Sequence, residues 1–184
     1  MQKQIINTLR PNATAQDAIR AFRGSGVLQW YQRIRRGSLH RIADVYVPFW
    51  IYRVSYAMNG AHVSRWLAMD AVNGSLDLFE FAKLPGGDEL CEVQTRNVLE
   101  SRLSLERAGE LLREKALRVV FEQGFFKWRN AELRIEQESI TVHVPYWLGF
   151  HASGARANCR VMDAVRRRVE GAKAAAFFEQ WLAA

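Results

Sequence analysis

Two segments of the chain are dominated by hydrophobic and aromatic residues, and both carry the same block of residue types. Residues 45–56 and 140–151 are rich in Val, Ile, Tyr, Phe and Trp, a composition typical of β-strands. The order Val-x-Val-Pro-aromatic-Trp begins at Val45 and again 97 positions later at Val142. Because proline has no backbone N–H, each strand is expected to be unpaired on one side or kinked at this block. The recurrence indicates two copies of one module.

A second block, Met-Asp-Ala-Val, occurs at residues 69–72 and again, 93 positions later, at 162–165. In the first copy it runs into the dipeptide 73–74, Asn-Gly, which is a strong signal for a tight turn. This predicts a β-hairpin over residues 63–81. The second copy has Arg-Arg at 166–167 instead, and these residues disfavour the same tight turn.

Three further segments have the spacing of amphipathic helices. Residues 14–22 open with Thr14 and place Asp17 three positions on, a combination that caps a helix start. The corresponding helix of the second copy is longer, 104–124, and a C-terminal helix over 172–182 has one apolar face that would cover part of the sheet. The apolar stripe of the second helix consists of Leu105, Ala108, Leu111, Leu112, Ala116 and Val119.

The shared order of these elements predicts an α+β fold. We expect two tandem copies of a module made of a helix and an antiparallel sheet, related by approximate two-fold symmetry and closed by the C-terminal helix. The first repeat is predicted at 14–82 and the second, with the capping helix, at 104–184. Residues 83–103 contain Pro-Gly-Gly and are predicted to be a linker.

Alternation along the two strands assigns their side chains to two faces. The face with Val45 and Val47 is predicted to be core. The other face is rich in aromatic residues and histidine, and it is a candidate surface for an unknown protein or a small apolar ligand; packing within the chain is the alternative. The residues of this candidate face are Tyr46, Trp50, Tyr52, Tyr56, His143, Trp147 and His151.

Charge suggests a second kind of partner. The chain has 26 Lys and Arg against 19 Asp and Glu, a net charge of +7, and part of this excess lies in two arginine clusters. Such clusters attract phosphates, so RNA binding is an alternative function, while solvated surface residues are the structural alternative. The clustered residues are Arg33, Arg35, Arg36, Arg41, Arg166, Arg167 and Arg168.

The chemistry-bearing residues favour a non-enzymatic role. The four histidines lack the spacing of a metal site, and no glycine-rich phosphate loop or nucleophile motif is present, so we expect neither metal nor cofactor. The two cysteines, Cys91 and Cys159, are expected to be free thiols. Asp70 and Asp163 precede turns and are expected to accept backbone N–H bonds there. As a paired acid and base they would instead make the protein a small hydrolase.

A helix that opens with Thr or Ser, has Ala four positions on, and leads to antiparallel strands ending in Asp-Ala-Val-x-Gly resembles the PepSY-like modules of bacteria. The resemblance rests on residues 14–18 and 70–74, and more loosely on 104–108 and 163–165. It implies a bacterial protein with a non-catalytic binding or inhibitory role. The Pro-aromatic-Trp block is a departure from that pattern.

Residues 1–12 carry Lys3 and Arg10 and lack the apolar run of an export signal, whereas PepSY-like modules often lie outside the cytoplasm. We therefore expect a cytoplasmic protein. No apolar stretch has the length of a membrane-spanning helix, so we expect no membrane span. The sequence leaves open whether the chain forms a homodimer.

Overall fold

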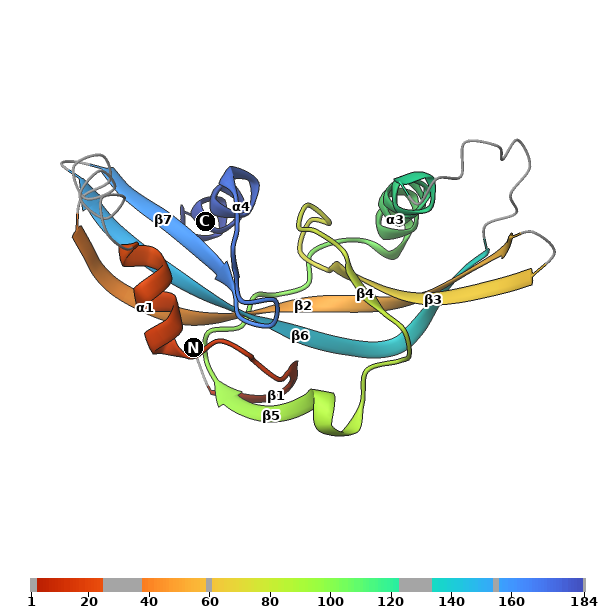
Figure 1. Cartoon of the computed structure of the whole chain (residues 1–184), viewed down its shortest axis with the longest axis horizontal. Helices are drawn as coiled ribbons and strands as arrows, with labels where there is room; N and C mark the ends of the chain where they lie inside the picture. Colours follow the sequence, from red (N-terminus) through yellow and green to blue (C-terminus); the bar gives the residue numbers. More distant parts are fainter. Residues whose placement is uncertain (1–2, 25–37, 59–60, 123–133, 154–155, 184) are drawn as a thin grey trace. The chain divides into compact units, whose positions relative to one another are not determined.

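The computed structural model describes residues 3–24, 38–58, 61–122, 134–153 and 156–183 (Figure 1). These residues form an α+β fold in which three α-helices accompany an eight-stranded, mostly antiparallel sheet. The strand order is β4-β3-β2-β6-β1-β5, with β7 paired to β6 and β8 paired to β7. The elements are β1 (Gln4–Leu9), α1 (Ala15–Arg23), β2 (Ser38–Met58), β3 (Ala61–Asp70), β4 (Phe79–Phe81), β5 (Leu90–Thr95), α3 (Leu105–Glu122), β6 (Arg134–Ser153), β7 (Arg156–Asp163), β8 (Arg168–Val169) and α4 (Ala172–Ala183).

The chain divides into two compact units, and each of them draws on both halves of the sequence. Unit 1 consists of Met1–Val47, Asp88–Leu99 and His143–Ala184, and unit 2 consists of Pro48–Gly87 and Glu100–Val142. Each unit groups residues that lie close together in the structure, whereas each predicted repeat is one continuous range of the sequence. The repeat ranges therefore stay a prediction.

In unit 1, α1 begins and ends where its capping residues predict. The Thr14 hydroxyl accepts the Asp17 N–H at 3.3 Å, and the Asp17 carboxylate accepts the Thr14 N–H at 2.9 Å. This reciprocal pair satisfies backbone donors that the first helical turn leaves free. Gly24 ends the helix with a φ of 72°, in the left-handed region that glycine adopts readily.

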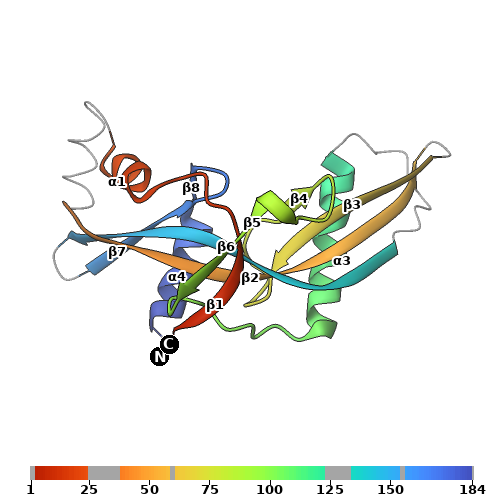
Figure 2. The same ribbon diagram turned by 90° about the horizontal axis from the view of Figure 1, so that it is seen from below.

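The two helices of unit 1 pack on opposite faces of β6 and β7 (Figure 1, Figure 2). On one face, Phe22 of α1 belongs to a buried cluster with Met162 of β7, and Trp147 of β6 packs against that cluster. On the other face, Tyr146 of β6 contacts Phe178 of α4, with ring centroids 5.4 Å apart. Successive residues of a strand point to opposite faces, so Tyr146 and Trp147 fix the two sides.

In unit 2, α3 lies against β2 and β3 (Figure 2). Ala108, Leu112 and Ala116 of the predicted stripe are fully buried there. The prediction that Leu105 belongs to the buried stripe was wrong, because this side chain is 64% exposed. Leu105 occupies the first turn of α3, beyond the part of the helix that the sheet covers. The buried partners on the sheet are Tyr52, Val54, Tyr56, Leu67 and Met69.

The hydrophobic pattern of the sequence did not predict two of the strands. Residues 4–9 form β1, and residues 90–95, within the predicted linker, form β5; the two pair antiparallel over six positions. Their hydrophobic alternation is weak. In β1 the two adjacent residues Ile5 and Ile6 are both apolar, although Ile5 is 69% exposed and Ile6 is buried. The predicted strands 45–56 and 140–151 exist as parts of the longer β2 and β6.

The predicted hairpin exists, but its turn is longer than expected. β3 and β4 pair antiparallel from Ala68–Phe79 to Trp66–Phe81, so residues 71–78 connect them rather than a two-residue turn at 73–74. The shorter connection is at 164–167, between β7 and β8, where Arg167 has a φ of 54°. The Arg-Arg sequence therefore supports a tight reversal that its residue types disfavour.

Pro145 lies where β6 changes its neighbour. At His143, β6 pairs in parallel with Thr8 of β1, and from Tyr146 onward it pairs antiparallel with β7, beginning at Asp163. The pairing with β1 and the pairing with β7 are interrupted between His143 and Tyr146, and a residue without a backbone donor is tolerated at such an interruption.

Candidate functional site

A pocket with a volume of about 370 Å³ lies wholly within unit 1. Its walls come from β2, from β6 and from the C-terminal end of α4, with one residue of the segment that follows β5. Its size is in the range of small-molecule sites in proteins, about 300 to 1,000 Å³. The lining residues are Arg41, Ala43, Asp44, Val45, Asn97, Leu148, Phe150, Trp181 and Leu182.

The apolar wall depends on the position of α4. Phe177 and Phe178 contact each other at 4.9 Å between ring centroids and are buried, which anchors the middle of the helix on the sheet. One turn later, Trp181 is half-buried and Leu182 is 49% exposed. These two side chains extend the apolar face of α4 beyond its anchored part and form one side of the pocket.

The polar side chains that line the pocket differ in whether they have a partner within the protein. The Asn97 side-chain amide donates to the Asp44 carboxylate at 3.1 Å, and the Asn97 backbone N–H donates to the Thr95 hydroxyl at 3.1 Å. Tyr46 lies beside Asp44 without lining the pocket; burial and then Asp44 raise the pKa of this phenol to about 12, so it is neutral at neutral pH. Arg41, by contrast, is exposed and makes no ion pair with any residue that the structure describes.

The predicted aromatic face is occupied by packing within each unit. Tyr52 and Tyr56 are buried against α3, and Tyr46 is buried against Ile6 and Val98. Burial therefore extends to both faces of β2, whereas the sequence suggested one core face. Ligand binding by this face stays a prediction.

The two tryptophans of the repeated block have similar surroundings in their own units. Trp50 is half-buried and packs against the α3 cluster of unit 2, and Trp147 is half-buried and packs against the α1 cluster of unit 1. The Trp147 indole N–H donates to the carbonyl of Ala13 at 3.0 Å. Neither residue lines the pocket described above.

Both histidines of the predicted face belong to unit 1, where His143 is half-buried and His151 is buried. The His143 ring lies 3.0 Å from the Asn7 carbonyl, to which its Nδ1–H donates. Burial lowers the pKa of His143, while the hydrogen bond to Asn7 acts in the opposite direction. His151 is 5% exposed. No group of three His, Cys, Asp or Glu side chains suited to a metal ion occurs among the described residues.

Asp70 and Asp163 are both fully buried and both hold turns. The Asp70 carboxylate accepts the N–H groups of Asn73, Gly74 and Leu76 at 2.8 to 3.0 Å. The Asp163 carboxylate accepts two N–H groups, those of Val165 and Arg166, at 2.9 and 2.8 Å. The expected turn-holding role is confirmed for each residue.

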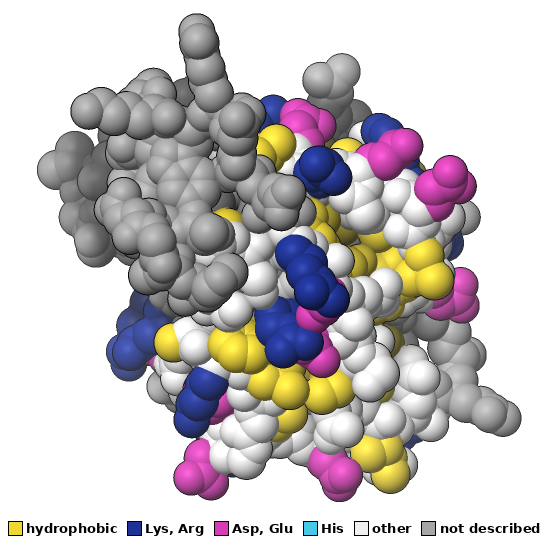
Figure 3. All heavy atoms as spheres, turned by 90° about the vertical axis from the view of Figure 1, so that its right-hand side faces the viewer, with side chains coloured by type: hydrophobic (Ala, Val, Ile, Leu, Met, Phe, Trp, Pro, Cys, Tyr) yellow, Lys and Arg dark blue, Asp and Glu magenta, His cyan; other side chains and the backbone are white. Residues whose placement is uncertain are grey.

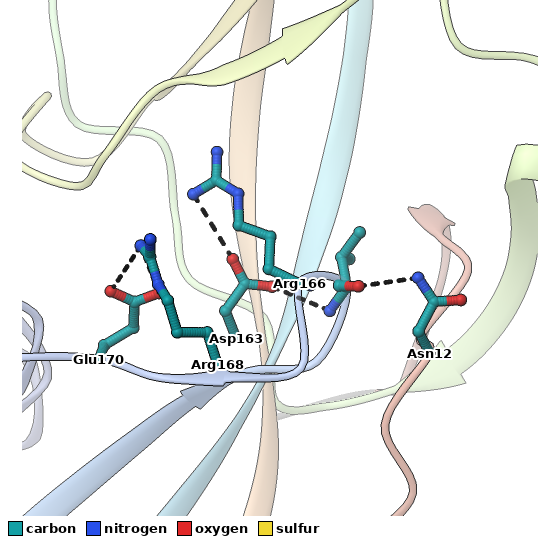
Figure 4. A network of polar contacts seen from close by, with 6 residues as sticks. Asn12, Asp163, Arg166, Arg168 and Glu170 are labelled. Carbon is teal, nitrogen blue, oxygen red and sulfur yellow. Dashed lines mark hydrogen bonds and ion pairs between the residues drawn. The ribbon is translucent and has the colours of Figure 1, made fainter.

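The second arginine cluster is engaged with carboxylates. Figure 4 shows the Arg166 guanidinium directed at Asp163, at 3.7 Å, and Arg168 paired with Glu170 at 3.0 Å. Arg167 lies 3.8 Å from Asp17. These pairs lower the positive potential that the cluster offers to a phosphate. Of the first cluster, Arg41 is described, while Arg33, Arg35 and Arg36 lie outside the described residues.

Charges are paired in unit 2 as well. Arg53 lies 2.6 Å from Glu136, and Arg65 pairs with Glu80. Figure 3 shows the described Lys and Arg side chains of one face interspersed with Asp and Glu. RNA binding stays a prediction, and its electrostatic support among the described residues is local rather than a broad basic field.

Cys159 is a poor nucleophile in this fold. Its side chain is buried, and burial followed by the nearby Glu179 carboxylate raises the pKa of the thiol to about 12. A thiol with this pKa is protonated at neutral pH, and the thiolate is the reactive form. Cys91, the other free cysteine, is half-buried.

Of the pocket residues, the sequence singled out Arg41 for its charge and the terminal helix for its apolar face. It did not indicate that β2, β6 and α4 meet around a cavity. The available signal was the far end of that helix, where Trp181 and Leu182 extend beyond the buried positions.

None of the helices in the described part of the chain is long and apolar enough to span a membrane. The chain matches no protein-family model, no curated protein and no solved structure.

Proposed function

We propose that this protein is a non-enzymatic binding module and that the pocket of unit 1 holds a small, largely apolar ligand. The observation that carries the proposal is the composition of that pocket. Leu148, Phe150 and Trp181 provide apolar walls, and three polar side chains provide points of orientation. Ligand sites in proteins combine a mainly hydrophobic lining with a few placed polar groups in this way.

We further propose that the fold arose by duplication of a helix-plus-sheet module. In unit 2, the Ala71 N–H donates to the Pro48 carbonyl at 2.8 Å, and in unit 1 the Ala164 N–H donates to the Pro145 carbonyl at 3.1 Å. The carbonyls of Ala71 and Ala164 in turn each accept two N–H groups from the segment that precedes α3 or α1. The matching residues are those of the repeated blocks, which supports a common origin.

The chemistry of the described residues supports binding over catalysis. The carboxylates of Asp70 and Asp163 are committed to backbone N–H groups in separate units, and the Cys159 thiol is held protonated. A hydrolase with Asp70 as its acid or base would lose its turnover on Asp70→Asn in a variant that still folds, which separates the two readings.

Anilinonaphthalene sulfonate, a fluorescent probe with an apolar body, tests the pocket. The folded protein should bind it with one saturable site, and Ala43→Leu, which places a larger side chain in the pocket wall, should weaken that binding. The matched control is Ala175→Leu on α4, since Ala175 does not line the pocket. Equal binding by both variants would contradict the proposal.

A further inference from the structure

The pocket carries a charge asymmetry that indicates the class of its ligand. Asp44 already accepts a hydrogen bond from Asn97, so its negative charge is partly satisfied inside the protein. Arg41 lines the same pocket, is exposed, and has no carboxylate partner among the described residues. An unpaired guanidinium offers a planar set of N–H donors that matches a carboxylate.

The rest of the wall is apolar. Leu148 and Phe150 of β6 line it together with Trp181 and Leu182 of α4. Leu182 is 49% exposed, so part of this apolar wall is in contact with water. A ligand with a hydrocarbon part would remove these surfaces from water.

From these two features we infer that the pocket binds an amphipathic monocarboxylate, with its carboxylate on Arg41 and its hydrocarbon chain between β6 and α4. The inference rests on the proposed binding function and names the ligand class for the same pocket. At about 370 Å³ the pocket suits one short chain rather than a two-chain lipid.

Octanoate and octanol test the inference, because the two probes share a hydrocarbon chain and differ in charge. Titration of the full chain, followed by calorimetry and by tryptophan fluorescence, should show octanoate binding about fivefold more tightly than octanol, the ratio that corresponds to about 1 kcal/mol for an exposed ion pair. Within the series from butanoate to octanoate, each methylene should tighten binding by up to about fourfold.

Two surface variants locate the carboxylate. Arg41→Gln should reduce octanoate affinity to that of octanol and leave octanol binding unchanged, whereas Arg113→Gln, an exposed arginine of α3 in unit 2, should change neither. Trp181→Phe should remove the fluorescence change that octanoate produces.

Different results would overturn the carboxylate inference and the proposed binding function. Equal affinity for octanoate and octanol, unaffected by Arg41→Gln, would overturn the carboxylate inference and leave the binding function in place. Binding of octanoate that survives both Arg41→Gln and Ala43→Leu would place the site elsewhere and overturn the inference. Failure of both probes, together with failure of the naphthalene probe, would overturn the proposed function itself.

Discussion

Phe22 of α1 lies over Gly149 of β6, so closely that a Cβ atom at position 149 would be 2.4 Å from Cδ2 of the ring. The phenyl ring is 1% exposed, and the guanidinium of Arg160 lies 5.5 Å from its centroid on the same side of the sheet. Glycine at 149 is therefore a packing requirement for the seat of α1 rather than a requirement of backbone conformation.

Gly149→Ala should destabilise the protein by about 1 to 3 kcal/mol, because the added methyl group must displace a fully buried ring. Urea denaturation followed by circular dichroism measures the loss. Gly109→Ala is the matched control: no atom lies within 4 Å of a Cβ at this helical position, so alanine should stabilise α3 by about 0.5 to 1 kcal/mol. If Phe22→Leu fails to rescue Gly149→Ala, this packing account is wrong.

Gly74 and Arg167 follow Asp70 and Asp163 by four positions in the two repeated blocks, and both have left-handed backbones, with φ values of 69° and 54°. Arg167→Gly should stabilise the protein by about 0.5 kcal/mol, since a left-handed residue with a Cβ costs about 1 to 2 kcal/mol and glycine's extra freedom in the unfolded chain returns part of this. Gly74→Ala should destabilise, because its Cβ would also lie 2.8 Å from Leu111. Thermal unfolding of both variants measures the contrast, and a destabilised Arg167→Gly would contradict it.

Asp163 should make stability depend on pH. Its burial, opposed by hydrogen bonds from Arg166 and Val165, raises the pKa of the carboxyl above the usual 3.8. A group whose pKa is higher in the folded state contributes its stability fully below the unfolded value, and that contribution is lost as the pH rises through the folded value.

The stability of the natural protein relative to Asp163→Asn should therefore fall as the pH rises from about 4, because the amide does not titrate. Urea denaturation of both proteins at a series of pH values, each extrapolated to water, gives this difference. A difference that grows with pH would show that the sign is wrong.

The two free thiols should react differently. Cys159 is 7% exposed with a pKa near 12, whereas Cys91 is half-buried on β5. At about pH 8, Ellman's reagent should therefore titrate one thiol in the native protein and both in urea. Cys91→Ser should remove the native reaction, and a native reaction that persists in this variant would contradict the assignment.

A cut between Gly86 and Gly87 should leave the two fragments bound to each other. β1 of the first fragment pairs with β5 of the second over six positions, and α1 packs on Met162 and Ala164. A protease site inserted there and cleaved in the folded protein tests this. The fragments should elute together from a gel-filtration column and separate in urea; separation without denaturant would show that each half is self-sufficient.

Local signals in the sequence were enough to locate most of the regular elements. The capping pair Thr14–Asp17 defines the start of α1, and the spacing of Ala108, Leu112 and Ala116 identifies the buried stripe of α3. The two turn-holding aspartates were also predictable. Each of these features depends on residues a few positions apart, so it is encoded locally.

The tertiary structure decided what covers each element. β1 and β5 are short and weakly alternating, and they become strands by pairing with each other. The paired residues, such as Ile6 and Val93, are more than 80 positions apart in the chain. The second face of β2 is buried because α3, from the other half of the chain, lies on it. The pocket forms where β2, β6 and α4 meet. Such contacts join residues far apart in the chain, and hydrophobic periodicity identifies a face that must be buried without specifying its partner.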